Sequence, residues 1–389
     1  MALALLASPA VPREAWLSLR GTGLLTLQDA ATLPAGRVTA AGGVDNRDRD
    51  PLGLDLLDGS LAWAAGLTPR LETYGYAVLS RVAALPERPA LPPPPLDLIV
   101  APGTSVPLRP YYAVYPETPY VDKRGRARFD EWVPGDAVIG IKHRLTETAG
   151  LRPALALSAE LKLPLSRSLA DLQSGSGTAG VDLGAHLIGE WKWGGSTWIA
   201  SAGYVRTGPP GLHDRLIAAA DNGGPATVAE QPLVLADRLE AGLGVRHLLT
   251  PRLAAVLEAV KVFETGRRTP VLDAAPPLDV LAGVQVRWGR ARLAAGLRYH
   301  GDALPSGSLR PTPLAGLVDV TDVAPAELAR YLAALGAVSA LPALRAGSHR
   351  LVAARDALPL PEGARLLPES YRVRSEHQVG FVIVWGWAF

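Results

Sequence analysis

Charged side chains recur at every second position along several stretches of this chain, opposite a face of apolar side chains. Between residues 155 and 165, for example, Ser158, Glu160 and Lys162 alternate with leucines and alanines. Charged groups in such a row can filter small solutes by size and charge if they line a water-filled pore. We therefore predict that the following residues line a lumen: Lys142, Arg144, Arg152, Glu160, Lys162, Asp182, His186, Glu190, Lys192, Arg238, Glu240, Arg246, Arg287, Arg292 and Arg298.

Arginine and lysine outnumber the acids in this inward set, and two interpretations follow. Basic rings favour anionic solutes, so the first is a weak anion preference. The second, which we favour, is charge pairing that fills and stiffens a narrow lumen. His186 and His300 share the inward face. We expect them to be solvated or hydrogen-bonded, because no Asp or Glu stands at a metal-ligand spacing from either.

The elements that carry these side chains are expected to be long strands, because period-two alternation is typical of half-buried strands. Runs of about 10–15 residues suit membrane strands, whereas soluble strands average about five or six. We therefore predict an all-β fold, a transmembrane antiparallel β-barrel of about 12 strands. The strands are expected near 37–46, 54–67, 70–81, 135–147, 151–165, 178–193, 196–207, 233–248, 252–264, 278–288, 290–301 and 376–389.

The connections between these strands alternate between short and long, as in outer-membrane barrels with short periplasmic turns and long extracellular loops. The longest loops are expected at about 82–134 and 302–375, and either could fold into the lumen as a plug. Within the second loop we expect a helix at about 325–335, with proline at an early helical position.

Aromatic side chains at the strand ends favour a membrane barrel over a soluble sandwich, because tryptophan prefers the membrane interface. They predict two girdles, formed by Trp191, Trp193, Trp198, Tyr204, Trp288, Tyr299, Trp385 and Trp387. The chain ends on alternating aromatic and apolar residues, with Phe389 last. This ending resembles the C-terminal signal that the barrel-assembly machinery recognises, although Val384 replaces the usual glycine.

The segment from Gly135 to Leu145, GDAVIGIKHRL, resembles the Gly-Asp-x-x-x-Gly-x-Lys-Tyr motif of outer-membrane transporter barrels of the phenol-degradation meta-pathway family, with His143 in place of the tyrosine. Residues 21–45 resemble the opening strand of those proteins, and residues 177–193 resemble a later one. The resemblance implies a barrel and small-molecule passage, and it supplies no catalytic residues.

Residues 1–10, MALALLASPA, are expected to be the remnant of a signal peptide, which leaves 11–389 as one barrel domain. The net charge of +2 gives no support for nucleic-acid binding. The chain has no cysteine, and it carries neither a serine-hydrolase elbow nor a zinc-protease or phosphate-loop motif. We expect no enzyme activity and no cofactor. A lipid-facing hydrolase of the outer-membrane phospholipase A type would need a serine beside His143, and none is evident.

We therefore expect a porin-like channel or transporter in the outer membrane of a Gram-negative bacterium, through which small solutes diffuse. The alternative is a closed structural or adhesin-like barrel that acts through its long extracellular loops. The expected partners are outer-membrane lipid, lipopolysaccharide, the barrel-assembly machinery and small-molecule solutes.

Overall fold

The computed structural model describes residues 16–49, 54–84, 95–104, 106, 112–113, 134–148, 152–165, 180–232, 234–265, 278–301, 309–311, 314–354, 358–372 and 378–389. Twelve strands of this part of the chain form one closed barrel. They are β3 (Val38–Arg49), β4 (Leu54–Thr68), β5 (Leu71–Ala84), β8 (Asp136–Arg144), β9 (Ala154–Pro164), β10 (Asp182–Trp193), β11 (Ser196–Arg206), β15 (Asp237–Thr250), β16 (Leu253–Thr265), β17 (Leu278–Trp288), β18 (Ala291–Gly301) and β24 (Gln378–Ala388).

Every neighbouring pair in the barrel is antiparallel, and the last strand closes the wall by pairing with the first. That seam runs from Phe381 opposite Asn46 to Ala388 opposite Thr39. Closure leaves the wall without an unpaired strand edge, which is the condition for crossing hydrocarbon. The predicted fold class, a barrel of about 12 antiparallel strands, is confirmed.

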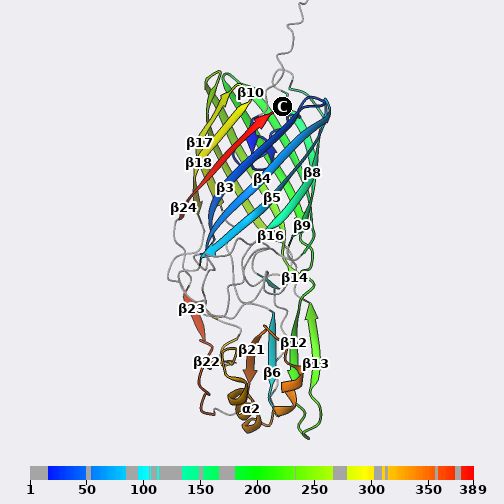
Figure 1. The fold of residues 1–389 in the computed structure, drawn as a ribbon, viewed down its shortest axis with the longest axis vertical. Helices are drawn as coiled ribbons and strands as arrows, with labels where there is room; N and C mark the ends of the chain where they lie inside the picture. The colour runs from blue at the N-terminus through cyan, green and yellow to red at the C-terminus, as the bar shows by residue number, and fades with distance from the viewer. Residues whose placement is uncertain are drawn as a thin grey trace, which may run out of the picture.

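Tight turns connect the strands at one end of the barrel, which we call the short-turn end. Trp193 pairs with Ser196, and Trp288 pairs with Ala291, so each of these hairpins has a loop of two residues. The first residue of each loop is a glycine with positive φ, 58° at Gly194 and 57° at Gly289. Two-residue hairpin loops need this conformation, which side chains disfavour. The C-terminus lies at the same end (Figure 1).

Beyond the opposite end, the loop end, three long connections contribute to a small folded unit that we call the loop domain (Figure 1). Its sheet contains β13 (Thr227–Pro232), β12 (His213–Ala218), β6 (Leu96–Val100), β21 (His349–Ala353), β20 (Val318–Asp319) and β22 (Arg365–Leu366), in that order. β12 and β21 both run parallel to β6, which lies between them. Parts of the long connections between barrel strands therefore fold into a sheet of their own.

The helix α2 (Pro325–Ala334) and the 3-10 helix η1 (Val338–Ala343) complete the loop domain. Pro325 stands at the start of α2, where its missing N–H costs nothing, so the predicted helix is confirmed. Its Leu328, Tyr331 and Leu332 pack with Ile99 and Val352 of the sheet in one apolar core. Two short pairings lie elsewhere: β7 (Tyr112–Ala113) with β14 (Val234–Leu235), and β19 (Leu309–Pro311) with β23 (Ser370–Arg372).

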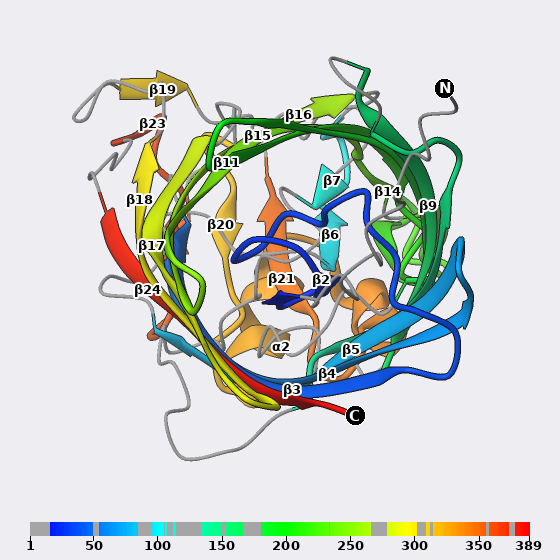
Figure 2. The ribbon, with the colours of Figure 1, turned by 90° about the horizontal axis from the view of Figure 1, so that it is seen from above.

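The N-terminal segment lies inside the barrel (Figure 2). Its β1 (Leu17–Ser18) and β2 (Gly21–Thr22) pair with each other, and the chain then returns to the short-turn end before β3 begins at Val38. We call residues 16–34 the plug. The first strand, predicted near 37–46, corresponds to β3, whereas residues 21–34, which resemble part of the opening strand of the transporter family, belong to the plug. The described plug therefore comes from the N-terminal segment rather than from a long loop.

No helix among the described residues is long and apolar enough to span a membrane. The predicted signal-peptide remnant, residues 1–10, lies outside the described residues.

Candidate functional site

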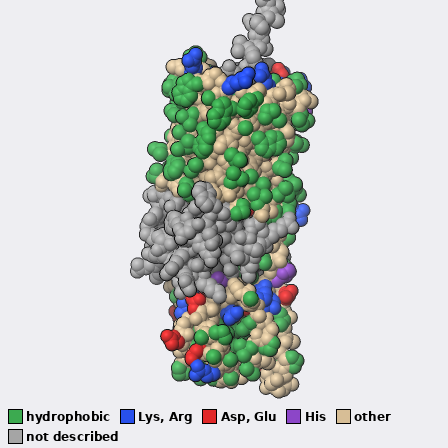
Figure 3. Space-filling view, viewed as in Figure 1, with side chains coloured by type: hydrophobic (Ala, Val, Ile, Leu, Met, Phe, Trp, Pro, Cys, Tyr) green, Lys and Arg blue, Asp and Glu red, His purple; other side chains and the backbone are tan. Residues whose placement is uncertain are grey.

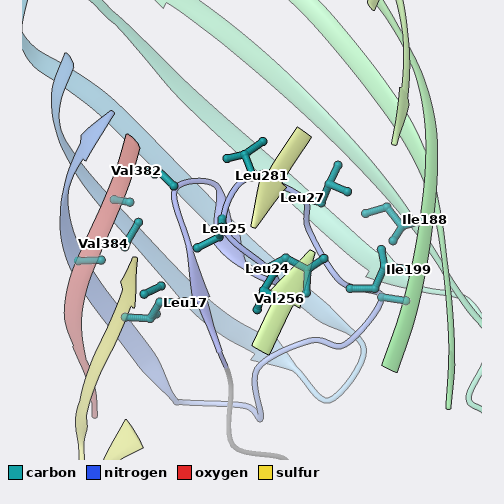
Figure 4. Close-up of a cluster of buried hydrophobic side chains, with 14 of the residues drawn as sticks. Leu17, Leu24, Leu25, Leu27, Ile188, Ile199, Val256, Leu281, Val382 and Val384 are labelled. Atoms are coloured by element: carbon teal, nitrogen blue, oxygen red, sulfur yellow. The ribbon is translucent and has the colours of Figure 1, made fainter. Parts of the chain in front are cut away.

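Apolar side chains of the plug pack against the inner wall of the barrel. Leu17, Leu24, Leu25 and Leu27 are buried in one cluster with inward side chains of the wall (Figure 4). The wall side of the cluster includes Ile188, Ile199, Val256, Leu281, Val382 and Val384. A fully buried leucine contributes about 1.5–3 kcal/mol relative to an exposed one, so the cluster strongly favours the inserted plug.

The wall is shaped to fit these leucines, because inward glycines stand where the plug comes closest. A Cβ on Gly244 would lie 2.3 Å from Leu24, and one on Gly296 would lie 2.5 Å from Leu25. Three further glycines are equally close to the plug. A Cβ would lie 2.5 Å from Leu27 at Gly242, 2.6 Å from Leu19 at Gly43 and 2.7 Å from Leu17 at Gly386. Real Cβ contacts are not this short, so a side chain at any of these positions would push on the plug.

A buried ion cluster fastens the plug near the short-turn end. The ammonium of Lys142, on β8, lies 3.2 Å from Glu72 on β5 and 3.7 Å from Asp29 of the plug. It also donates a hydrogen bond of 2.7 Å to the hydroxyl of Thr22. Lys142 and Glu72 are both fully buried, so each charge depends on the other for compensation. Lys142 therefore contacts the plug rather than open lumen.

Two further wall residues bind the plug backbone. The carboxylate of Glu258 accepts hydrogen bonds from the N–H groups of Thr26 and Leu27, at 2.8 and 3.2 Å, and from the Thr26 hydroxyl. The amide nitrogen of Gln285 donates to the carbonyl oxygens of Leu17, Gly23 and Leu24. These contacts provide hydrogen-bond partners for backbone groups of the plug inside the barrel.

Between the plug and the short-turn end lies a small pocket with a basic excess. It is lined by Lys192, Arg246 and Arg287, with Asp29 and Glu190 as the acids. The guanidinium groups of Arg246 and Arg287 lie 5.4 and 4.4 Å from the ring centre of Trp16, within the range of cation–π attraction. Trp16 thus lines this pocket from the plug side and packs against both arginines.

On the loop side of the plug lies a cavity, here called the vestibule, whose floor is formed by Leu19, Arg20, Thr26, Leu27 and Gln28. It has a volume of about 180 Å³. Pockets for drug-sized ligands measure ~300–1,000 Å³, so the vestibule with the plug inserted can hold only a small solute. Its acids are Asp45, Asp58, Asp136, Glu160, Glu240 and Asp279, and its cations are Arg20, Lys162, Arg238 and Arg298.

Several of the vestibule charges form ion pairs. Lys162 bridges Asp136 and Asp182, at 3.0 and 2.9 Å, and Arg298 lies 3.0 Å from Asp45. Glu240 pairs with both Arg20 and Arg238. In addition, Glu160 lies 3.6 Å from Nε2 of His186, and Asp279 lies 2.5 Å from Nδ1 of His300. This agrees with the charge-pairing interpretation. Among the described lining residues the acids outnumber the cations, so these residues do not form the basic ring that an anion preference needs.

The remaining predicted inward residues lie at the short-turn end. Arg144 donates a hydrogen bond to the carbonyl oxygen of Pro69, and Arg292 donates to that of Gly289. Lys192 is exposed, although it lines the inner pocket, and Arg152 is exposed just before β9. No group of three or more His, Asp or Glu within the described ranges is arranged to hold a metal ion.

The outer face of the barrel is an apolar belt (Figure 3). Leucines such as Leu187, Leu243 and Leu297 are at least half exposed along the strand middles. Trp193, Trp288 and Trp387 are exposed at the short-turn end, and Tyr204 and Tyr299 are exposed towards the loop end. Trp198 and Trp385 are also exposed, and Trp191 is half-buried. An apolar belt flanked by aromatic residues on a closed barrel is the surface that lipid requires. This is a bacterial outer-membrane barrel.

Sequence analysis did not predict that residues 16–34 form a plug, although the inward faces of several strands carry apolar residues that indicate one. A water-filled lumen favours polar side chains. Ile188, Ile199, Leu281 and Val384 nevertheless fall on the inward face of their strands. Together with the leucines of residues 17–27, these positions indicate an apolar partner inside the barrel.

No protein-family model matches the chain, and no curated protein matches it by sequence. Among solved structures it is similar to an outer membrane channel from Pseudomonas putida F1, with 9% identity over 94% of this chain and 100% of that chain and a TM-score of 0.48. It is also similar to the beta domain of the Bordetella autotransporter BrkA, with 10% identity over 91% of this chain and 100% of that chain and a TM-score of 0.38. The deltaS2 mutant of the TodX monoaromatic hydrocarbon channel has 12% identity over 98% of this chain and 99% of that chain, with a TM-score of 0.33. At these values the likeness says nothing about solute or activity.

Proposed function

We propose that this protein is an outer-membrane channel or transporter for small solutes, and that its N-terminal plug closes the pathway at rest. One observation carries the proposal: the plug separates two polar, charge-lined cavities within a single barrel. The vestibule lies on its loop side and the basic pocket on its short-turn side. Removal of the plug would join these two spaces into one lumen.

The way in which the plug is held supports a movable closure. Both ends of the plug lie at the short-turn end, where Gly36 and Gly66 hydrogen-bond as the chain leaves the barrel. The plug therefore need not pass through the wall to leave the lumen. Its contacts with Lys142, Glu72 and Glu258 are polar, and water can replace polar partners on withdrawal.

Single-channel conductance in planar bilayers tests this proposal. The whole chain is compared with a variant that begins at Ala35 and so lacks the plug. We expect the whole chain to be closed for most of the time and the shortened variant to give discrete, lasting conductance steps. Silence from a shortened variant that is shown to be folded and inserted would contradict the proposal.

One observation favours a second function, a closed barrel that acts through its surface. The loop domain has a sheet, a helix and apolar cores of its own, which a simple porin would not need. Under this hypothesis the shortened variant would stay silent. Deletion of α2 and η1 would then abolish attachment of whole cells to a surface and leave the barrel intact.

A further inference from the structure

Exposed arginines surround the short-turn end of the barrel. Three hairpins there have loops of two residues with arginine at the second loop position, namely Arg70, Arg252 and Arg290. Arg37 stands directly before β3, and Arg152 stands shortly before β9. All five side chains are exposed, and we call them the basic rim. In the strand order of the barrel they are spread around the wall rather than gathered on one side. Figure 3 shows lysine and arginine side chains at this end of the molecule.

Negative charge is scarce at the same end. Among the described exposed residues there, Glu147 is the only acidic side chain, and it lies 3.1 Å from Arg144. The C-terminal carboxylate also lies there, because Phe389 and Val38 exchange two backbone hydrogen bonds. Five arginines therefore face two negative groups, one of which is already paired, and the described rim has a net positive charge.

Turn geometry does not account for these arginines. The second position of a two-residue hairpin loop favours glycine, asparagine or aspartate. The sequence Leu-Thr-Pro-Arg nevertheless places arginine there twice, at 67–70 and at 249–252. The Gly194–Gly195 turn closes a hairpin of the same barrel without any charge. The repeated arginine therefore indicates a function at the surface rather than a requirement of the backbone.

Aromatic side chains fix the level of the rim relative to the membrane. Trp288 and Trp387 are exposed, and both pair with Ala291, which directly follows Arg290. Tryptophan rings lie at the level of the lipid headgroups. A turn just beyond them therefore reaches the phosphate groups. A guanidinium matches a phosphate in charge and geometry, because it can donate two parallel hydrogen bonds.

We propose that the basic rim binds the phosphate groups of anionic phospholipids, of the phosphatidylglycerol type, in the leaflet at the short-turn end. The inference goes beyond the proposed function, because it concerns the outer surface and holds whether or not the lumen conducts. Anionic lipids are favoured over zwitterionic ones, because a zwitterionic headgroup brings a cation of its own to the arginines. No covalent bond forms or breaks in this interaction.

Electron spin resonance of spin-labelled lipids tests the inference, with the whole chain reconstituted in phosphatidylcholine bilayers. Spin-labelled phosphatidylglycerol or phosphatidylcholine is added, and the immobilised fraction of each gives its relative affinity for the barrel surface. We expect phosphatidylglycerol to be preferred about fivefold, which corresponds to about 1 kcal/mol, the contribution of one basic residue at a charged membrane surface. Salt at about 1 M should reduce this preference, because it screens exposed charges.

Three variants decide whether the rim is responsible. The triple variant Arg70→Gln, Arg252→Gln and Arg290→Gln should lower the preference to about twofold or less. Lysine at the same three positions is the matched control, since it keeps the charge and should retain most of the preference. Arg330→Gln removes an exposed arginine of α2 in the loop domain and should change nothing.

Two results would overturn the inference. One is an equal preference in the triple glutamine variant and the unaltered chain, which would leave the rim to an acidic protein partner. The other is a loss in the triple lysine variant as large as that with glutamine, which would assign the effect to altered turns. Replacing chloride by inorganic phosphate at equal ionic strength should leave the preference unchanged. Its disappearance there would show that the rim takes free phosphate instead of lipid.

Discussion

The plug and the loop domain both bury charged groups contributed by segments far apart in the sequence, but they balance the charges differently. At the plug, one cation, Lys142, lies between Glu72 and Asp29. In the loop domain, two cations converge on one carboxylate, since Asp97 is paired with both Arg215 and Arg345. The neighbouring Asp214 is buried and accepts a hydrogen bond from the backbone N–H of Leu96.

Because their charges are balanced differently, the two regions should respond to different perturbations. The pKa of Asp214 is raised to about 7, chiefly by burial, with the nearby charge of Asp97 adding to the effect. The pKa of Asp97 is instead lowered, because hydrogen bonds from Arg215, Arg345 and Ser348 outweigh its burial. The loop domain should therefore respond to pH near neutrality, whereas the plug should respond to the loss of an ionic partner.

The largest effect is expected from Lys142→Met, which leaves Glu72 buried and without its cation. Breaking a buried ion pair on one side costs about 3–5 kcal/mol, and here the cost falls on the inserted state of the plug. The chain has no cysteine, so a single Ala30→Cys substitution, at a fully buried plug position, can report plug release by maleimide labelling. We expect Lys142→Met to accelerate labelling strongly.

Lys192→Met is the matched control, because Lys192 is an exposed lysine at the same end of the lumen. It should change labelling by a factor of about five or less, far below the effect of Lys142→Met, since exposed charges contribute about 0–1 kcal/mol. Equal acceleration by both variants would show that the buried cluster does not fasten the plug.

The second prediction is that the loop domain loses stability as pH rises. Because Asp214 has a raised pKa in the folded state, folding favours its protonated form, so its stabilising contribution is complete below the ordinary value of 3.8 and declines up to about pH 7. A shift of about three units corresponds to roughly 4 kcal/mol. Between acidic pH and pH 8, hydrogen exchange of the β6 and β12 amides should therefore accelerate by more than the pH dependence of the intrinsic exchange rate explains.

Asp214→Asn keeps an acceptor for the Leu96 N–H and removes the titration. In this variant the excess exchange at pH 8 should disappear, while the labelling of the plug reporter should stay as in the parent. If the variant kept the full pH dependence, Asp214 would not be the responsible group.

The barrel could be predicted from the sequence because the alternation of charged and apolar side chains is visible within each strand by itself. In β9 and β10, for instance, charged and apolar side chains divide between the two faces, and pairing follows from short turns such as Gly194–Gly195. The position of the plug inside the barrel could not be predicted in this way. Its partners Glu258 and Gln285 lie more than 200 positions away along the chain, and no local periodicity links them to Leu24 or Thr26. The loop domain was missed for the same reason, because the strands that pair with β6 come from other connections.

A third prediction concerns Glu258→Gln, which keeps the shape of the side chain and removes its charge. Hydrogen bonds to a charged group contribute about 1.5–3 kcal/mol, against about 1 kcal/mol for a neutral one. Glu258 accepts hydrogen bonds from the N–H groups of Thr26 and Leu27. The variant should therefore release the plug more often than the unaltered chain does, but less often than Lys142→Met does. The measurement is the open fraction in single-channel records. An open fraction equal to that of the parent would mean that these hydrogen bonds do not hold the plug.

The smallest effect is expected from Gly296→Ala, because one methyl group can be accommodated by the flexible end of Leu25. The new Cβ would lie 2.5 Å from that side chain and 3.1 Å from the carbonyl oxygen of Ala282, so the end of the Leu25 side chain must move aside to restore ordinary van der Waals contact. Overpacking of this kind costs about 1 kcal/mol at the lower end of its range. Gly189→Ala is the matched control, since its Cβ would meet nothing closer than 3.8 Å. Labelling of the Ala30→Cys reporter should therefore rise about fivefold in Gly296→Ala and stay unchanged in Gly189→Ala, because only the first glycine faces the plug. If the two variants behaved alike, the close fit of wall glycines to plug leucines would have no part in keeping the lumen closed.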